Sequence, residues 1–246
     1  MIENTVIALD AGTDKAVDFL LKRYEKAKGT RENWVSLFEE CYEYALPQRE
    51  SFYAENPGQR RDDKIFDETA VVGVQEFASR LQSGLVPNFA RWADFIAGSE
   101  VPKEQRESVN AQLQEVTDYV FEVLQNSNFA QEVHESFLDL AVGTGVLLCE
   151  EGDAINPVRF SAIPLPHVVL DVGPDDRVDN IFRERQIRCG QILIAYPKAI
   201  LTPKIMERVK TYPEEKHKII EVIYRDYSKP NVLAHKYCVI DMQFKE

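Results

Sequence analysis

Long apolar runs and a secretion signal are both missing from this chain of 246 residues. Its longest apolar stretch, residues 142–149, contains two glycines and falls far short of the roughly 20 residues that cross a bilayer. The N-terminus carries no basic region ahead of a long apolar core. We therefore expect no transmembrane helix and no export, and a protein that works in the cytoplasm or in something assembled there.

Cysteine is scarce and widely spaced. The four cysteines form no C-x-x-C pair, which argues against a disulfide framework and against a zinc knuckle. We expect free thiols buried in the core, at Cys41, Cys149, Cys189 and Cys238.

Positive charge is in deficit. The chain has 29 Lys and Arg against 41 Asp and Glu, a net charge of -12. A broad DNA-binding surface needs clustered Lys and Arg to release phosphate counterions, so this balance opposes one. With 44% hydrophobic and 28% charged residues, the composition is that of an ordinary globular protein.

Common signatures of catalysis are missing as well. The chain has no G-x-S-x-G and no glycine-rich loop ending in Gly-Lys-Ser/Thr, which lowers the case for acyl or phosphoryl transfer. Gly143-Thr144-Gly145 follows a predicted helix and precedes a predicted strand, the reverse of the order that phosphate loops need. We expect a helix C-terminus with positive φ there, and no enzyme activity.

The histidines are spread along the chain, at positions 134, 167, 217 and 235. Zinc ligands usually occur in close sequence pairs, so the sequence predicts no metal site and no cofactor. A zinc site assembled from distant positions stays open as an alternative.

Apolar residues recur at three- and four-residue spacing through the first half, which predicts helices. We expect Gly29 to end the first helix and Thr30 to cap the second. Residues 48–64 are polar and predict an exposed loop, and residues 92–97 predict a short extended piece. The expected helices cover residues 14–28, 30–46, 67–85, 102–125 and 128–141.

Several aromatic residues accompany these helices. Trp34 and Tyr42 belong to a wide apolar stripe on the second expected helix. Because aromatic side chains bury so much apolar area, we expect Trp34, Tyr42, Tyr44 and Trp92 in the core.

Beyond residue 145 the apolar period changes to two, which predicts strands. The fold class is therefore α+β, with N-terminal antiparallel helices followed by a mostly antiparallel β-rich region with short helices. The corresponding domains are residues 1–145 and 146–246. The expected strands cover residues 146–150, 158–163, 168–171 and 178–188, followed by short helices over 190–196 and 203–211 and a hairpin of 218–227 with 232–244.

Two arginines alternate along one of these strands. Arg183 and Arg185 share one face, where they would meet a neighbouring acidic surface or phosphate. A solvated strand face is the default interpretation, because surface charges seldom mark a site.

Four stretches of sequence stand out together. They are W-x-x-L-F leading to C-Y-x-Y-A-L-P-Q-R, I-F-D-x-T-A leading through S-G-L-x-P to a tryptophan, N-S-N-F followed by A-V-G-T-G-V-L-L, and I-P-L leading to R-E. In this order and spacing they resemble the head-to-tail connector, or portal, proteins of short-tailed bacteriophages. The positions that carry the resemblance are Trp34, Tyr44, Pro47, Phe66, Asp67, Phe77, Ser79, Leu85, Pro87, Trp92, Gly143, Gly145, Pro164 and Arg183.

The resemblance implies a structural subunit of a homo-oligomeric ring, usually of twelve copies, at one vertex of the virion. Such rings are assembled in the host cytoplasm and are the passage for genome packaging and ejection. Their partners are capsid, scaffold, terminase and tail adaptor proteins, and double-stranded DNA passes through without sequence-specific binding. No bond chemistry, cofactor or membrane is implied.

Portal proteins of this kind are considerably longer than this chain. Their channel-lining helices normally follow the stretch matched here, so the resemblance implies an N-terminal part, largely the outer wing of the ring, that ends before the channel-lining stem. The polar segment 48–64 is then the preferred contact with a neighbouring subunit or the head wall. An unrecognised metal-dependent enzyme and a monomeric adaptor module are the alternatives.

Overall fold

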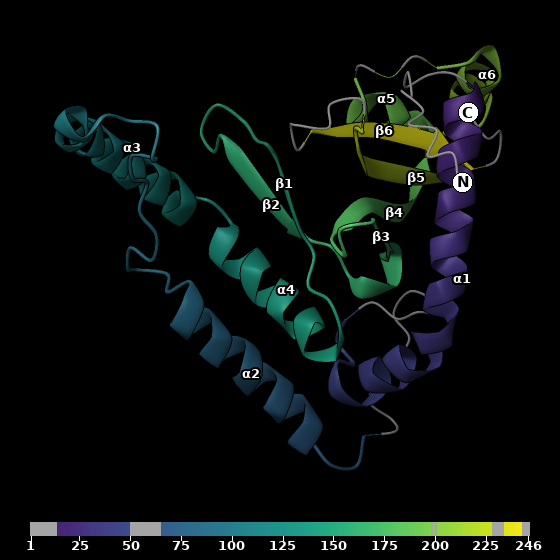
Figure 1. Ribbon diagram of the computed structural model, residues 1–246. Coiled ribbons are helices and arrows are strands. Elements are labelled where there is room, and N and C mark those ends of the chain that lie inside the picture. Colours follow the sequence, from purple (N-terminus) through teal and green to yellow (C-terminus); the bar gives the residue numbers. More distant parts are fainter. Residues whose placement is uncertain (1–13, 50–64, 198, 200, 228–233, 243–246) are drawn as a thin grey trace, which may run out of the picture. The chain divides into compact units, whose positions relative to one another are not determined.

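The computed structural model describes residues 14–49, 65–197, 199, 201–227 and 234–242 (Figure 1). The chain divides into two compact units. The sheet unit consists of Met1–Val35 and His167–Glu246, and the helical unit consists of Ser36–Pro166. This division follows contacts in space, whereas the boundary expected at residue 145 marks the change from helix to strand along the chain. The polar segment 48–64 lies outside the described residues from residue 50 onward.

Helix α1 (Asp14–Ala45) continues through Gly29, so the expected helix break there is wrong. A glycine inside a helix costs about 1 kcal/mol relative to alanine, which the contacts of a long helix readily outweigh. The Thr30 hydroxyl donates to the carbonyl oxygen of Lys26, 3.2 Å away, which is a bond within a helix and not an N-cap.

In its described residues, the sheet unit contains an antiparallel sheet in the order β3-β4-β5-β6. Its strands are β3 (Val168–Val172), β4 (Val178–Arg188), β5 (Lys216–Arg225) and β6 (His235–Asp241). Strands β5 and β6 pair antiparallel, as expected for the hairpin, and residues 228–233 between them lie outside the described residues.

The two faces of this sheet are covered by different helices, because alternate residues of a strand point to opposite sides. On one face, Phe182 and Val222 pack with Leu20 and Tyr24 of α1, and the Tyr24 and Phe182 rings meet edge to face with centroids 5.6 Å apart. On the other face, Ile219 packs in a separate cluster whose members are Ile187, Ile192 and Ile205. The last two lie on the short helices α5 (Ile192–Ala195) and α6 (Pro203–Thr211), which follow the 3-10 turn η3 (Cys189–Gln191).

The helical unit contains α2 (Thr69–Leu85), the 3-10 turn η1 (Lys103–Gln105), α3 (Arg106–Asn126) and α4 (Phe129–Val142). A two-stranded hairpin of β1 (Leu147–Glu151) and β2 (Val158–Ala162) follows, and the 3-10 turn η2 (Leu165–His167) leads out of the unit. Helix α4 packs against α2 and against the hairpin. The structure therefore confirms an α+β fold with antiparallel sheets.

The wide apolar stripe of α1 is divided in two. Tyr42 is buried, and Phe38 packs beside it against the core of the helical unit. Trp34 and Tyr44, on the other half, are 56% and 44% exposed, and Trp92 is 40% exposed, so placing these three in the core was wrong. The apolar spacing predicted the helix correctly. The apolar stripe is too wide for one helix to bury, however, so only half of it is covered.

Helix α3 buries little of its surface. Val116 is half exposed, and the buried side chain on this helix is Thr117. Its hydroxyl accepts a hydrogen bond from the backbone N–H of Phe95, and the side-chain oxygen of Asn110 accepts one from Ala97. Side chains of α3 thus accept hydrogen bonds from two backbone N–H groups of residues 92–97. These residues form no strand that would otherwise pair with those groups.

Gly145 is required for reasons of space, whereas a Cβ on Gly143 would lie 3.2 Å from the Phe38 ring and 3.3 Å from the Leu165 side chain. The φ of Gly143 is -166°, which is extended backbone, so the expected positive φ is wrong there. A Cβ on Gly145 would lie 2.5 Å from the backbone oxygen of Ser136. Glycine at residue 145 lets the chain pass close over α4 as it turns toward β1.

No helix in the described part of the chain has the length and apolar character needed to span a membrane. The four cysteines are free; Cys189 is buried and Cys149 is exposed, which corrects the expectation of uniformly buried thiols.

Candidate functional site

The residues that carry the family resemblance do not converge on one site. They lie along α1, α2 and the segments that join the helices and strands of the helical unit, and Arg183 lies on β4 of the sheet unit. Several are exposed: Phe66 almost completely, and Phe77 and Leu85 on α2 in part. Their distribution is that of positions that shape helices and surfaces, not of a catalytic centre. The positions that begin or end these segments are Pro47, Asp67, Pro87, Gly143, Gly145 and Pro164, and Ser79 is an exposed residue of α2.

Two of these positions have clear local roles. The Asp67 carboxylate accepts hydrogen bonds from the backbone N–H and the hydroxyl of Thr69, at 2.8 Å and 2.5 Å, and so stabilises the start of α2. These bonds lower the pKa of Asp67. Trp92 packs edge to face on Phe121 and stacks on Phe129, with ring centroids 5.3 Å and 6.3 Å apart. It therefore fixes the segment after α2 to α3 and α4 despite its partial exposure.

A buried ionic network closes the end of α1 within the helical unit. Asp139 of α4 is completely buried and accepts hydrogen bonds from Tyr42 and Arg49. Arg49 also contacts Glu135, one turn earlier on α4, at 2.5 Å. Burial and the neighbouring Asp139 charge raise the pKa of Tyr42, which therefore stays protonated as a donor. The network holds Arg49, the last residue of the first described stretch, against α4.

A second network lies on the α1 face of the sheet. Glu184 of β4 accepts from Lys28 at 2.8 Å, from Lys218 at 2.6 Å and from the Tyr24 hydroxyl. Burial alone would raise the pKa of Glu184, but these hydrogen bonds outweigh it and lower the pKa to about 2. The carboxylate is therefore charged at every physiological pH, and it ties α1 to two strands.

A third network lies on the opposite face, where Arg183 and Arg185 do share one side of β4. Both contact Glu221 of β5, at 3.0 Å and 3.3 Å. The Tyr196 hydroxyl donates to the same carboxylate, and burial followed by that bond raises the pKa of Tyr196 to about 12. The acidic partner of the two arginines is thus inside the sheet. This network satisfies their charge without a phosphate.

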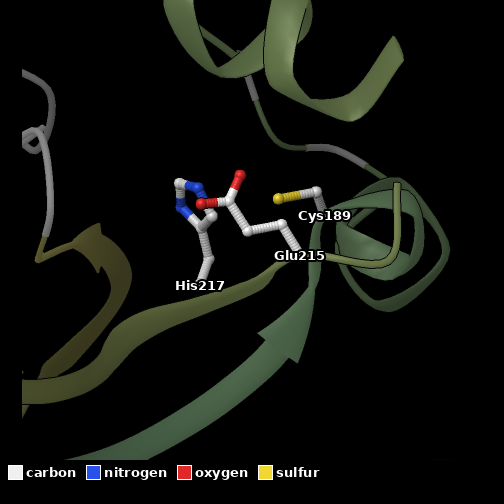
Figure 2. Close-up of side chains that lie close together, drawn as sticks. All are labelled: Cys189, Glu215 and His217. Atoms are coloured by element: carbon white, nitrogen blue, oxygen red, sulfur yellow. The ribbon is translucent and has the colours of Figure 1, made fainter. Parts of the chain in front are cut away.

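Cys189, Glu215 and His217 form the group in the described residues that could hold a metal ion (Figure 2). One ligand atom from each lies within 4.8 Å of the others. Sequence reasoning missed this group because it looked for close pairs of histidine and cysteine. The available signal was Glu215-x-His217, two ligand types two residues apart at the start of β5. Their partner Cys189, in η3 just after β4, becomes visible only through the strand register.

The comparisons with known proteins identify the family. The family model described as "Bacteriophage head to tail connecting protein" matches residues 18–245. The chain is also 25% identical over 184 residues to a protein of Bordetella phage BPP-1 named "Probable portal protein". That match covers 73% of this chain and 32% of the relative, so the chain spans about a third of the relative's length.

This chain belongs to the bacteriophage head-to-tail connecting protein family. The resemblance recognised in the sequence is therefore confirmed, and the chain is similar to a phage portal protein.

Proposed function

We propose that this chain is the outer wing of a subunit in a phage portal ring, at the vertex where the head meets the tail. The observation that carries this proposal is the family match, which extends over residues 18–245. The relative named as a portal protein is about three times as long as the stretch it shares with this chain. In this proposal the regions that line the DNA channel belong to sequence outside the matched stretch.

The ring serves as the passage for DNA during packaging and ejection and as the attachment point for the tail. Twelve copies, closed head to tail around the channel, are the arrangement we propose. Capsid, scaffold, terminase and tail adaptor proteins are its partners in the virion and during assembly. The wing needs no catalytic group for this role, because its task is to hold subunits together.

The exposed half of the α1 stripe supports a subunit contact. Trp34, Leu37 and Tyr44 are 56%, 49% and 44% exposed, and they follow one another along α1 at spacings of three and seven residues. Large exposed aromatic side chains in a row are typical of interaction surfaces. We propose that this row packs against the neighbouring subunit of the ring.

The test replaces one side chain in this row in the portal protein that contains the chain. Trp34→Glu places a charge in the proposed contact without opening a cavity, because Trp34 is already more than half exposed. We expect far fewer rings in electron micrographs, while the far-ultraviolet circular dichroism and melting temperature of the subunit stay close to wild type.

Glu32→Lys is the matched control, because it changes the charge of an exposed residue on the same helix outside the row. It should leave ring yield unchanged. If Trp34→Glu forms rings as well as the control does, the α1 row makes no contact between subunits.

A further inference from the structure

The side chains of Cys189, Glu215 and His217 meet on the α5 and α6 face of the sheet, where β4 ends and β5 begins (Figure 2). The backbone N–H of Cys189 donates to the carbonyl oxygen of Glu215 at 2.9 Å, one residue beyond the last pair of β4 and β5, Arg188 with Lys216. Ile187 pairs with His217 in the same antiparallel register. Residues two apart on a strand point to one side, so the register gathers all three side chains.

The three ligand types select one class of ion. A cysteine sulfur, an imidazole nitrogen and a carboxylate oxygen are the donors that zinc binds in proteins. Magnesium and calcium prefer oxygen alone, so the sulfur and the imidazole disfavour both. Three protein ligands leave one tetrahedral position for water.

Neighbouring side chains orient two of the three ligands. Nδ1 of His217 lies 2.7 Å from Oδ2 of Asp241, and because a carboxylate only accepts, this nitrogen carries the proton. The other ring nitrogen, Nε2, then presents a lone pair. A carboxylate behind the histidine is the usual support of a zinc ligand. Arg208 of α6 holds one oxygen of Glu215 at 2.5 Å, and the second oxygen can face the ion.

Two of the three ligands are buried and the third is exposed, so an ion could enter from solvent and be held in the interior. Cys189 and His217 are completely buried, whereas Glu215 is exposed and leaves an entry path from solvent. An ion here would join the end of β4 to the start of β5 and, through Arg208, to α6. That linkage is structural and does not require a reaction.

We propose that Cys189, Glu215 and His217 bind a zinc ion, with Asp241 as the positioning residue of the histidine. On binding, a sulfur–zinc bond forms and the thiol proton leaves to solvent. The site stabilises the fold of the sheet unit, because binding to the folded state alone adds to the free energy of unfolding. This proposal does not depend on ring formation and stands or falls separately from the portal function.

Cobalt(II) is the probe, since it takes the place of zinc and reports its ligands by colour. The untagged chain is stripped with a chelator and titrated with cobalt(II), then with zinc as a competitor. We expect one equivalent of cobalt, the absorption of a tetrahedral ion with a thiolate-to-cobalt band, and displacement by one equivalent of zinc. Melting temperature should rise with zinc.

Four variants locate the site. Cys189→Ser should abolish the thiolate band, and Cys149→Ser, at an exposed cysteine remote from the group in sequence, should keep it. Asp241→Asn should weaken binding roughly 10–100-fold. Glu215→Gln changes an exposed residue and should weaken binding by at least about tenfold, so it still tests the site if a buried variant fails to fold.

Three outcomes would overturn the proposal. They are the absence of stoichiometric binding at micromolar metal, a cobalt spectrum without a thiolate band, and equal affinities of wild type and Glu215→Gln. The last would assign the metal to adventitious surface ligands.

Discussion

Replacing Asp139 with alanine should strongly destabilise the helical unit. The carboxylate is completely buried, and it accepts hydrogen bonds from Tyr42 and Arg49. Its removal leaves a guanidinium with only 13% of its side chain exposed, and breaking a buried pair in this way costs about 3–5 kcal/mol. Because Arg49 keeps its contact with Glu135 at 2.5 Å, we expect the lower end, about 3 kcal/mol.

For a chain of this length, that loss lowers the melting temperature by roughly 6–12 °C. Urea unfolding followed by circular dichroism measures the free energy, and hydrogen exchange should show lost protection at the end of α1 and in α4. Glu135→Ala is the matched control, since it removes the other acidic partner of Arg49. Its side chain is 37% exposed, so the expected cost is below about 1 kcal/mol.

Tyr42→Phe tests the remaining contact. Losing the hydroxyl should cost about 1–2 kcal/mol, and the double variant with Asp139→Ala should cost less than the sum because the two side chains share one hydrogen bond. If Asp139→Ala unfolds within about 1 kcal/mol of wild type, the network contributes no net stability and the reasoning is refuted.

Three further predictions concern the rest of the fold. Hydrogen bonds lower the pKa of Glu184 from 4.5 to about 2. The ionised carboxylate therefore adds roughly 3 kcal/mol, before solvent screening, to the free energy of unfolding. This contribution is present above pH 4.5 and is lost as the pH falls to about 2. Wild type and Glu184→Gln should therefore converge in stability in acid titrations; a constant difference down to pH 2 would contradict this. Gly145→Ala should lower the free energy of unfolding by about 1–3 kcal/mol, because its Cβ would lie 2.5 Å from a backbone oxygen. Gly29→Ala should raise it by about 0.5–1 kcal/mol, because nothing lies within 4 Å of the added Cβ. Urea unfolding measures both changes. Trp92→Ala should cost about 2 kcal/mol by the same assay, and a change below about 0.5 kcal/mol would mean that its stacking on Phe129 adds nothing.

Local structure was largely predictable from the sequence. Proline at the first position of α6 and the period-two pattern of β4 predicted Pro203–Thr211 and Val178–Arg188 with the bounds observed. These signals are encoded in neighbouring residues. The prediction at Gly29 was wrong because glycine ends many helices but not all. The free energy that a glycine costs inside a helix is small beside the contacts of a 32-residue helix.

Long-range arrangement was not predictable in the same way. Tyr42 and Asp139 are 97 residues apart, and Cys189 meets His217 through a strand register that periodicity does not specify. The helical period located the α1 stripe, yet it did not say that one half would be buried and Trp34 left exposed. The family resemblance was visible because it depends on order and spacing along the chain, which the sequence contains directly.

The most direct test of the portal account is solution mass by light scattering, on this chain and on the longest natural reading frame that contains it. The account predicts rings of about twelve subunits from the long form, and a shift to smaller species with Trp34→Glu. If the long form stays monomeric across protein concentration and salt, the proposal that this chain is the wing of a portal ring is contradicted.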